Sequence, residues 1–159
     1  MKEEFNIVLN NINETKIFAR NISKFLKPSM ILCLYGEVGT GKTTFCRFLV
    51  NSLSKKKIKV LSPTFPILQV YDLKKLKIWH YDFYRLTNKN EILNLDFDLA
   101  KNDCVLIEWP KLMEKLLPQD RIEISFFDGD CSLSRKISIM FYGRFKKIKE
   151  KICIQLRKK

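Results

Sequence analysis

The feature that most constrains this chain is a glycine-rich segment from Gly36 to Thr43, which reads GEVGTGKT. It matches the pattern G-x-x-x-x-G-K-[ST], in which backbone N–H groups form a cradle for phosphate oxygens. Such a loop needs residues that tolerate positive φ angles, and three of the five glycines in the chain lie here. An apolar run, Met30 to Tyr35, precedes the loop, and a helical pattern from about Lys42 to Leu53 follows it. The sequence therefore predicts a buried strand, a phosphate-binding loop and a helix, in that order.

The chemistry of this loop predicts roles for two of its side chains. Lys42 is expected to bridge the β and γ phosphates of a nucleotide, and the hydroxyl of Thr43 to ligate Mg²⁺. The N-terminus of the following helix adds a favourable dipole for phosphate. A second acid is needed on the metal side, and the apolar run at residues 104–107 ends in Glu108. This pattern is typical of a Walker B strand with Glu in place of the more common Asp, so Glu108 is predicted to hold the metal ion or its water.

Two further polar segments adjoin apolar runs. The segment SPTF at residues 62–65 would place its hydroxyls near the same edge of the sheet. In the segment HYDFYRL, strand alternation puts His80, Asp82 and Tyr84 on one face. Asp82 is expected to hold a Mg²⁺-bound water or to orient the attacking water. The alternative is a solvent-facing stripe that an Asp–Arg pair closes.

Hydrophobic periodicity predicts an α/β fold with helices on both faces of one sheet. A helix capped by Asn13 is expected to run toward Lys27. The other predicted helices lie at residues 42–53, 91–95 and 112–117 and at the start of the tail from 144. The predicted strands lie at residues 5–9, 30–35, 58–61, 67–71, 77–83, 104–107, 121–127 and 135–141. The strands at 67–71 and 77–83 are expected to form a hairpin.

Composition restricts the class of protein. The length of 159 residues suits one compact domain, predicted to span residues 1–159 with a basic tail from about residue 144. A hydrophobic fraction of 46% is too high for a disordered basic chain. Lys and Arg total 30 against 17 Asp and Glu, a formal charge of +13. That charge favours nucleic acid, nucleotide phosphates or an acidic protein as partner, and a merely solvated lysine surface is the alternative.

Cysteine and histidine usage argues against a metal cluster of zinc-finger type. The five cysteines have no CxxC spacing, which indicates reduced and mostly buried thiols. They are Cys33, Cys46, Cys104, Cys131 and Cys153. His80 is the only histidine, so no multi-histidine site can form. We find neither a leader pattern nor an apolar run of spanning length, and the chain is expected to be soluble and cytoplasmic, without membrane contact.

Four sequence pieces occur in one order: GEVGTGKTT, SPTF, HYDFYRL and IEWP. This combination resembles the TsaE family, formerly called YjeE, of small bacterial P-loop ATPases. The resemblance extends from the helix near Thr15 to the strands after Pro118. It implies a P-loop NTPase-like three-layer sandwich, with a mostly parallel central sheet and antiparallel additions.

The resemblance also implies a function. TsaE proteins act in making threonylcarbamoyladenosine, the modified base next to the anticodon in tRNAs that read codons starting with A. They join a pair of TsaB and TsaD proteins and hydrolyse ATP with Mg²⁺ to reset that complex between turnovers. By this resemblance the chain is a weak, partner-dependent ATPase that meets tRNA indirectly, through the complex.

Matching motifs carry the family's site onto this chain. Residues of the loop would bind ATP: Glu37, Val38, Gly39, Thr40, Gly41, Lys42, Thr43 and Thr44. Thr43 and Glu108 would hold Mg²⁺, and Asp82 would assist hydrolysis together with Lys42 and Glu108. Thr15, early in the first helix, would lie near the adenine.

Other residues flank the expected site. The resemblance places Thr64 on a switch-like loop, and three neighbours of the site are expected at a partner surface: Tyr84, Arg85 and Trp109. Two positions depart from the family pattern. Lys111 stands where Glu is frequent, and Pro66 stands where Thr is frequent. Neither belongs to the predicted metal shell, and both are expected to act on partner contact or on the basal hydrolysis rate.

Two other functions share the motif or the charge. A small-molecule kinase has the same loop, but it closes a lid of arginines over the phosphates, whereas Arg47, Arg85 and Arg121 are scattered along this chain. A nucleotide-gated RNA-binding module without turnover would fit the charge of +13. No RRM, KH or zinc-knuckle pattern supports that module. The resemblance therefore implies a weak ATPase that works as a switch, in preference to either alternative.

Overall fold

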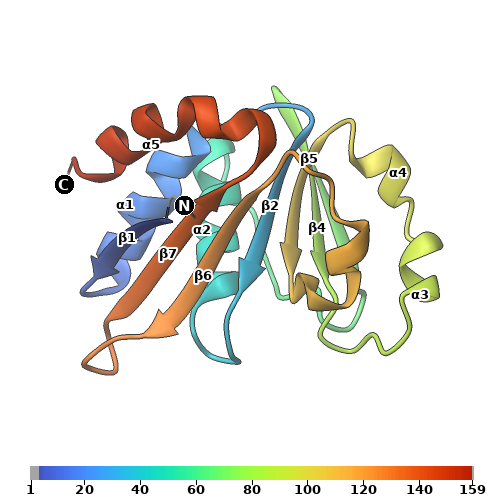
Figure 1. Ribbon diagram of the computed structural model, residues 1–159, viewed down its shortest axis with the longest axis horizontal. Coiled ribbons are helices and arrows are strands. Elements are labelled where there is room, and N and C mark those ends of the chain that lie inside the picture. Colours follow the sequence, from blue (N-terminus) through green and yellow to red (C-terminus); the bar gives the residue numbers. More distant parts are fainter. Residues whose placement is uncertain (1–3, 159) are drawn as a thin grey trace.

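The computed structural model describes residues 4–158, so residues 1–3 and 159 of the predicted domain lie outside the described residues. In this part of the chain, seven strands form one mixed sheet in the order β1-β7-β6-β2-β5-β4-β3 (Figure 1). The strands are β1 (Glu4–Leu9), β2 (Met30–Tyr35), β3 (Leu68–Leu73), β4 (Leu76–Asp82), β5 (Cys104–Glu108), β6 (Ile122–Asp128) and β7 (Arg135–Phe141). The four central strands, β6, β2, β5 and β4, are parallel. Strands β1 and β7 at one edge and β3 at the other pair antiparallel. The predicted parallel centre with antiparallel additions is confirmed.

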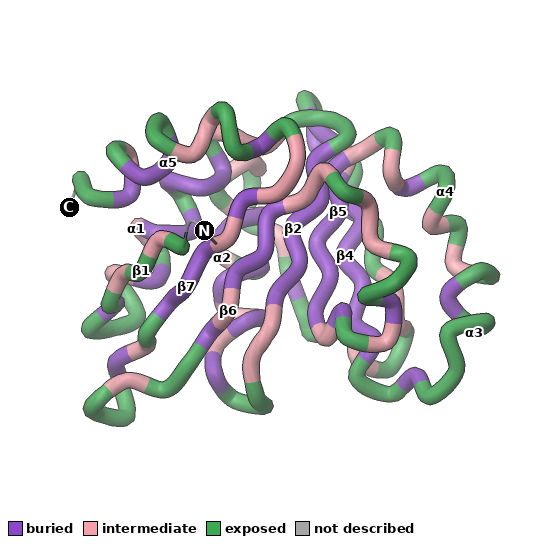
Figure 2. The backbone as a smooth tube through the Cα atoms, in the orientation of Figure 1, coloured by how far each residue is buried: buried purple, intermediate pink, exposed green. Residues whose placement is uncertain are grey.

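Helices cover both faces of this sheet, as predicted. They are α1 (Ile12–Ser23), α2 (Lys42–Leu53), α3 (Asn90–Leu93), α4 (Phe97–Ala100) and α5 (Lys149–Leu156), with 3₁₀ helices η1 (Pro110–Leu116) and η2 (Gly143–Ile148). Alternate residues of β2 enter two separate cores, because successive side chains of a strand point to opposite faces. Leu32 and Leu34 pack with α1, α2 and α5, whereas Ile31 and Cys33 pack with α3, α4 and η1. The buried strands lie between these layers (Figure 2).

Several predicted elements are confirmed. The hairpin forms from β3 and β4, with Leu73 opposite Leu76. The tail is helical, first as η2 and then as α5. All five cysteines are free thiols, and four of them are buried; Cys131 is exposed. None of the helices in residues 4–158 is both long and apolar enough to span a membrane.

The strand predicted at residues 58–61 is wrong. This segment is extended but does not join the sheet. Side chains of α2 take up its backbone groups instead: Asn51 donates to the Ile58 carbonyl at 3.1 Å and accepts from the Ile58 N–H at 2.8 Å, and Arg47 Nε donates to the Val60 carbonyl at 3.0 Å. Val60 is buried in the core. The segment has a strand-like sequence because it is partly buried. Its backbone is held by side-chain hydrogen bonds from α2 rather than by a neighbouring strand.

The predicted bounds of the first helix are also wrong. Asn11, not Asn13, is the N-cap, and its side chain accepts from the Glu14 N–H at 3.1 Å. The Glu14 carboxylate in turn accepts from the Asn10 N–H at 2.8 Å, a reciprocal arrangement of the capping-box type. The helix ends at Ser23 rather than near Lys27.

Two short elements differ slightly from their predicted ranges. The helix predicted at 91–95 spans Asn90–Leu93, and α4 follows it without having been predicted. The turn predicted at 112–117 is the 3₁₀ helix Pro110–Leu116.

Candidate nucleotide-binding site

The glycine-rich loop joins β2 to α2 and has the backbone that its pattern demands. Gly36 has φ of 137°, and a Cβ built there would lie 2.5 Å from the Phe126 carbonyl oxygen. Gly41 caps α2 in the left-handed region with φ of 101°. The hydroxyl of Thr40 closes the loop by donating to the Glu37 carbonyl at 2.8 Å. The loop thus presents the N-terminus of α2 to solvent, where phosphate binds favourably.

A cleft of about 280 Å³ opens beside this loop. Its lining residues are Val38, Gly39, Gly41, Lys42, Thr43, Thr44, Ser62, Thr64, Asp82, Tyr84, Glu108 and Trp109. Asp82 ends β4 and Glu108 ends β5, and parallel pairing sets these two residues opposite each other. The register also sets Glu108 opposite Leu34 at the end of β2. The cleft therefore lies at the C-terminal edge of the central strands, where ligands bind in open α/β sheets.

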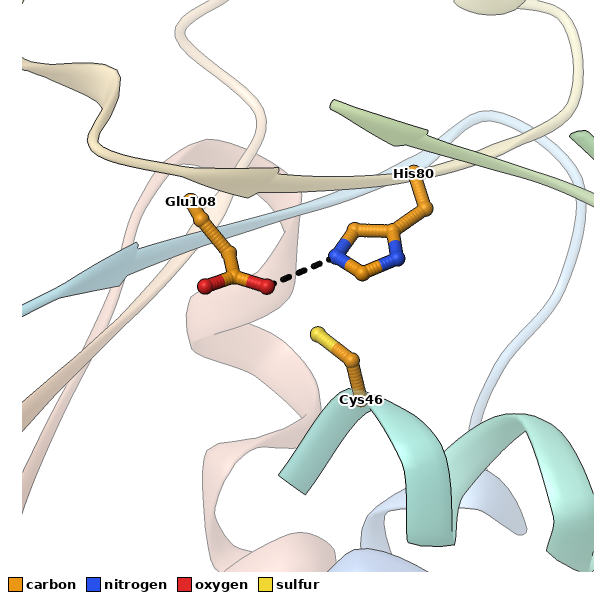
Figure 3. A group of neighbouring side chains, drawn as sticks. All are labelled: Cys46, His80 and Glu108. Atoms are coloured by element: carbon orange, nitrogen blue, oxygen red, sulfur yellow. Dashed lines mark hydrogen bonds and ion pairs between the residues drawn. The ribbon is translucent and has the colours of Figure 1, made fainter. Parts of the chain in front are cut away.

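Thr43, Glu108 and His80 form a chain of hydrogen bonds at the base of the cleft. Thr43 Oγ1 lies 3.0 Å from Glu108 Oε1 and 2.8 Å from Glu108 Oε2. His80 Nε2 lies 2.8 Å from Glu108 Oε1, and the two side chains point toward each other (Figure 3). His80 Nδ1 is buried without a hydrogen-bond partner in the described chain. That favours the tautomer with its proton on Nε2, because Nδ1 then leaves no donor unpaired. His80 fixes the orientation of the Glu108 carboxylate, a role that the sequence analysis did not assign.

Cys46 of α2 lies against this pair (Figure 3). One ligand atom from each of Cys46, His80 and Glu108 lies within 4.8 Å of the others, and all three residues are buried. Burial raises the pKa of the Cys46 thiol well above its usual value, and the Glu108 and Asp82 carboxylates raise it further. A thiolate is therefore disfavoured here, and the thiol packs as a small apolar group.

Asp82 is tied to the segment SPTF. Its Oδ2 accepts from Thr64 Oγ1 at 2.7 Å and from Ser62 Oγ at 3.4 Å. Its Oδ1 accepts from the Tyr84 N–H at 2.9 Å. Asp82 is 2% exposed and forms no ion pair among the described residues, whereas Arg85 lies over the Phe65 ring at 4.7 Å. The alternative of an exposed stripe closed by an Asp–Arg pair is therefore wrong.

Lys42 is directed at its own loop. Its Nζ donates to the Gly36 carbonyl at 2.6 Å and to the Glu37 carbonyl at 2.8 Å. The ammonium also lies 4.3 Å from the centroid of the Trp109 ring. Burial lowers the pKa of Lys42, and the surrounding carboxylates, Glu108 first, oppose that shift. Two of the three ammonium donors are thus engaged by the loop itself.

The remaining predicted residues lie around this centre. Thr15 lines a second hollow of about 160 Å³, which shares Gly39, Gly41 and Thr44 with the cleft. Thr15 is therefore close to the loop but not in the cleft. Arg85 lines neither hollow. Glu37 takes part through its backbone carbonyl, which accepts from Lys42 Nζ.

Sequence reasoning missed Arg135 at the start of β7. Its Nε donates to the Thr40 carbonyl at 3.0 Å and its Nη2 to the Gly39 carbonyl at 3.3 Å. The guanidinium thereby ties the β6–β7 hairpin to the phosphate loop. No local signal marks this residue, because its partners lie about ninety-five positions earlier in the chain.

Comparison with known proteins identifies the family. The family model "Threonylcarbamoyl adenosine biosynthesis protein TsaE" matches residues 9–137. The chain belongs to the TsaE family. A "tRNA threonylcarbamoyladenosine biosynthesis protein TsaE" from Rickettsia prowazekii is 42% identical over 118 residues, which cover 74% of this chain and 82% of that protein. The protein of the same name from Bacillus subtilis is 40% identical over 114 residues, which cover 72% of each chain.

A solved structure has a similar fold. The crystal structure of Bacillus subtilis YdiB matches with a TM-score of 0.79 and 30% identity, and it covers 96% of this chain and 95% of that one. The TsaE match includes the loop, Asp82, Glu108 and Arg135, and it ends before η2 and α5. The family resemblance seen in the sequence is confirmed.

Proposed function

We propose that this chain binds ATP and hydrolyses it as the nucleotide switch of tRNA threonylcarbamoyladenosine formation, acting on a complex of TsaB and TsaD homologues in the cytoplasm. Membership of the TsaE family supports the pathway. One structural observation supports the chemistry: the Thr43 hydroxyl and the carboxylates of Glu108 and Asp82 converge on the cleft beside the phosphate loop.

The donor set at the cleft fits Mg²⁺. A hydroxyl and carboxylate oxygens are the ligands that this hard cation prefers, and Thr43 and Glu108 already lie in contact. These two residues would hold the ion. Asp82 lines the same cleft and would bind a water molecule that coordinates the ion. Bound there, Mg²⁺ would neutralise charge on the phosphate oxygens.

The other groups of the cleft account for binding and hydrolysis. Backbone N–H groups of the loop and the Lys42 ammonium would bind the phosphates. Asp82 would orient a water whose oxygen bonds to the γ phosphorus as the bond to the β–γ bridging oxygen breaks. ADP and phosphate are the products.

The hydrogen bonds of the isolated chain support a low intrinsic rate. Both Asp82 oxygens are occupied, by Thr64, Ser62 and the Tyr84 N–H. Lys42 is held by loop carbonyls and covered by Trp109. A partner that contacts Thr64, Tyr84, Arg85 and Trp109 could release Asp82 and Lys42 toward the nucleotide. Control of the ATPase by TsaB and TsaD would follow from that rearrangement.

Binding and hydrolysis of ATP by single-residue variants test this proposal. Lys42→Ala should weaken ATP binding and abolish hydrolysis, because the ammonium would contact the phosphates both in bound ATP and in the transition state of hydrolysis. Asp82→Ala and Glu108→Ala should lower hydrolysis at least roughly 100-fold, about 2.7 kcal/mol, with a smaller loss of binding. Asp72→Ala on β3, an exposed aspartate, is the matched control and should behave as wild type. Wild-type turnover in Asp82→Ala or Glu108→Ala would remove that residue from the mechanism.

A further inference from the structure

A strongly basic groove lies away from the nucleotide cleft. It has a volume of about 970 Å³ and is formed by α1, the C-terminal half of α2 and residues 54–61. Seven of its lining residues are cationic: Lys16, Arg20, Arg47, Lys55, Lys56, Lys57 and Lys59. No aspartate or glutamate of residues 4–158 lines it. Seven of the 30 lysines and arginines of the chain therefore meet on one concave surface.

The described part of the chain supplies these cations with no acidic partner. Five lysines and arginines elsewhere in residues 4–158 pair with carboxylates, among them Arg121 with Glu123 and Lys136 with Asp130. None of the seven groove cations forms an ion pair within that part of the chain. Like charges gathered without counter-charges repel one another, so an anion in the groove would be bound favourably.

Hydrogen bonds hold the backbone at the floor of the groove before any ligand binds. Asn51 holds Ile58 through both of its backbone groups, and Arg47 Nε holds the Val60 carbonyl. The Arg47 bond uses one guanidinium nitrogen and leaves the two terminal ones for a ligand. The basic segment 55–59 is thus anchored at its end, and less ordering is needed when a ligand binds.

We propose that this groove binds the sugar–phosphate backbone of RNA. Its charge is spread over a concave surface too large for one phosphate group, which suits a chain of phosphodiesters. Among the described residues, Phe48 is the one aromatic side chain that lines the groove, and it packs against the core, so these residues offer bases no stacking platform. The groove therefore contacts backbone phosphates without reading sequence. The choice of tRNA as the RNA rests on the proposed function. The binding of an RNA backbone by the groove does not rest on it.

The test is the affinity of the full chain for unmodified tRNA as a function of salt. The variant combines Lys55→Gln, Lys56→Gln and Lys57→Gln. Its matched control combines Lys89→Gln, Lys111→Gln and Lys115→Gln, which remove the same charge from exposed positions on the opposite face of the sheet.

Each phosphate contact contributes about 0.7–0.9 to the slope of log affinity against log salt. The groove variant should lose about 2–3 units of slope and, at 0.1 M salt, roughly 100-fold in affinity. The control should keep most of both. An equal loss in the two variants, or none in the groove variant, would overturn the proposal.

Two further readouts separate the possible outcomes. The first is the affinity for polyglutamate. If polyglutamate binds the wild-type chain as tightly as tRNA does, and the groove variant loses both affinities equally, the occupant is an acidic protein and not RNA. Basal ATP hydrolysis should be unchanged in the groove variant, because none of its lysines lines the cleft. Loss of tRNA binding with intact hydrolysis supports the groove. A wild-type chain without any hydrolysis would refute the proposed function and leave the tRNA result standing.

Discussion

Replacement of His80 with alanine probes the hydrogen bond that orients Glu108. The change removes the donor to Glu108 Oε1, and both residues are buried, at 0% and 2% exposure. Glu108 Oε1 would keep its contact with Thr43, and losing a hydrogen bond to a buried carboxylate costs about 1.5–3 kcal/mol. The space left by a buried imidazole adds about 1–2 kcal/mol. We expect His80→Ala to lower the free energy of unfolding by about 4 kcal/mol, or Tm by roughly 8–16 °C for a chain of this size.

The same change should act on magnesium. Glu108 without its partner would no longer be held against Thr43, so His80→Ala should raise the Mg²⁺ concentration needed for half-maximal ATP hydrolysis. His80→Gln places an amide donor near the position of Nε2, and it should recover much of the stability and of the Mg²⁺ dependence. Urea unfolding followed by tryptophan fluorescence and Mg²⁺ titrations of hydrolysis measure the two effects.

Two results would show that the hydrogen bond from His80 does not hold Glu108 in place. The first is a His80→Ala protein within about 1 kcal/mol of wild type with an unchanged Mg²⁺ dependence. The second is a His80→Gln protein as impaired as His80→Ala, since the donor to Glu108 would then not be what matters.

Three smaller predictions follow from other contacts. Arg135→Gln should weaken ATP binding about 5- to 10-fold because the phosphate loop loses two carbonyl contacts, and a fluorescent-ATP titration with unchanged affinity would contradict this. Asn51→Ala should cost about 2 kcal/mol in urea unfolding, whereas Asn51→Asp keeps the bond from the Ile58 N–H and should cost about half as much. A hydrogen bond with the Ser134 side chain lowers the pKa of exposed Cys131, so this thiol should react first with a disulfide reagent and stay reactive at lower pH than an ordinary cysteine. Cys131→Ser should remove that fast phase; its persistence would show that a buried thiol is accessible.

Much of the site could be predicted because its signals are local. The loop pattern fixes the positions of Lys42 and Thr43, and an apolar strand ending in an acid identifies Glu108. Strand alternation predicted His80, Asp82 and Tyr84 on one face. His80 and Asp82 do point to the α2 side of the sheet, whereas β4 ends at Asp82 and the alternation does not extend to Tyr84. The sequence could not show that β4 pairs in parallel with β5, and this pairing brings His80 to Glu108.

The features that the sequence did not predict correctly depend on contacts between distant or competing groups. Residues 58–61 have the composition of a strand, but Asn51 and Arg47 satisfy their backbone from a helix. Asn11 and Asn13 are equally good caps by residue type, and the reciprocal bond from Glu14 to Asn10 favours Asn11. Arg135 reaches the phosphate loop only once the sheet has formed.

Whether the chain works as a nucleotide switch is decided by ATP hydrolysis with and without a purified TsaB–TsaD pair, with tRNA modification followed in the same tube. We expect slow hydrolysis by the chain alone, faster hydrolysis with the pair, and repeated rounds of modification that Lys42→Ala abolishes. ATP binding with no change in hydrolysis or in modification when the pair is added would show that the chain is not a switch for that pair.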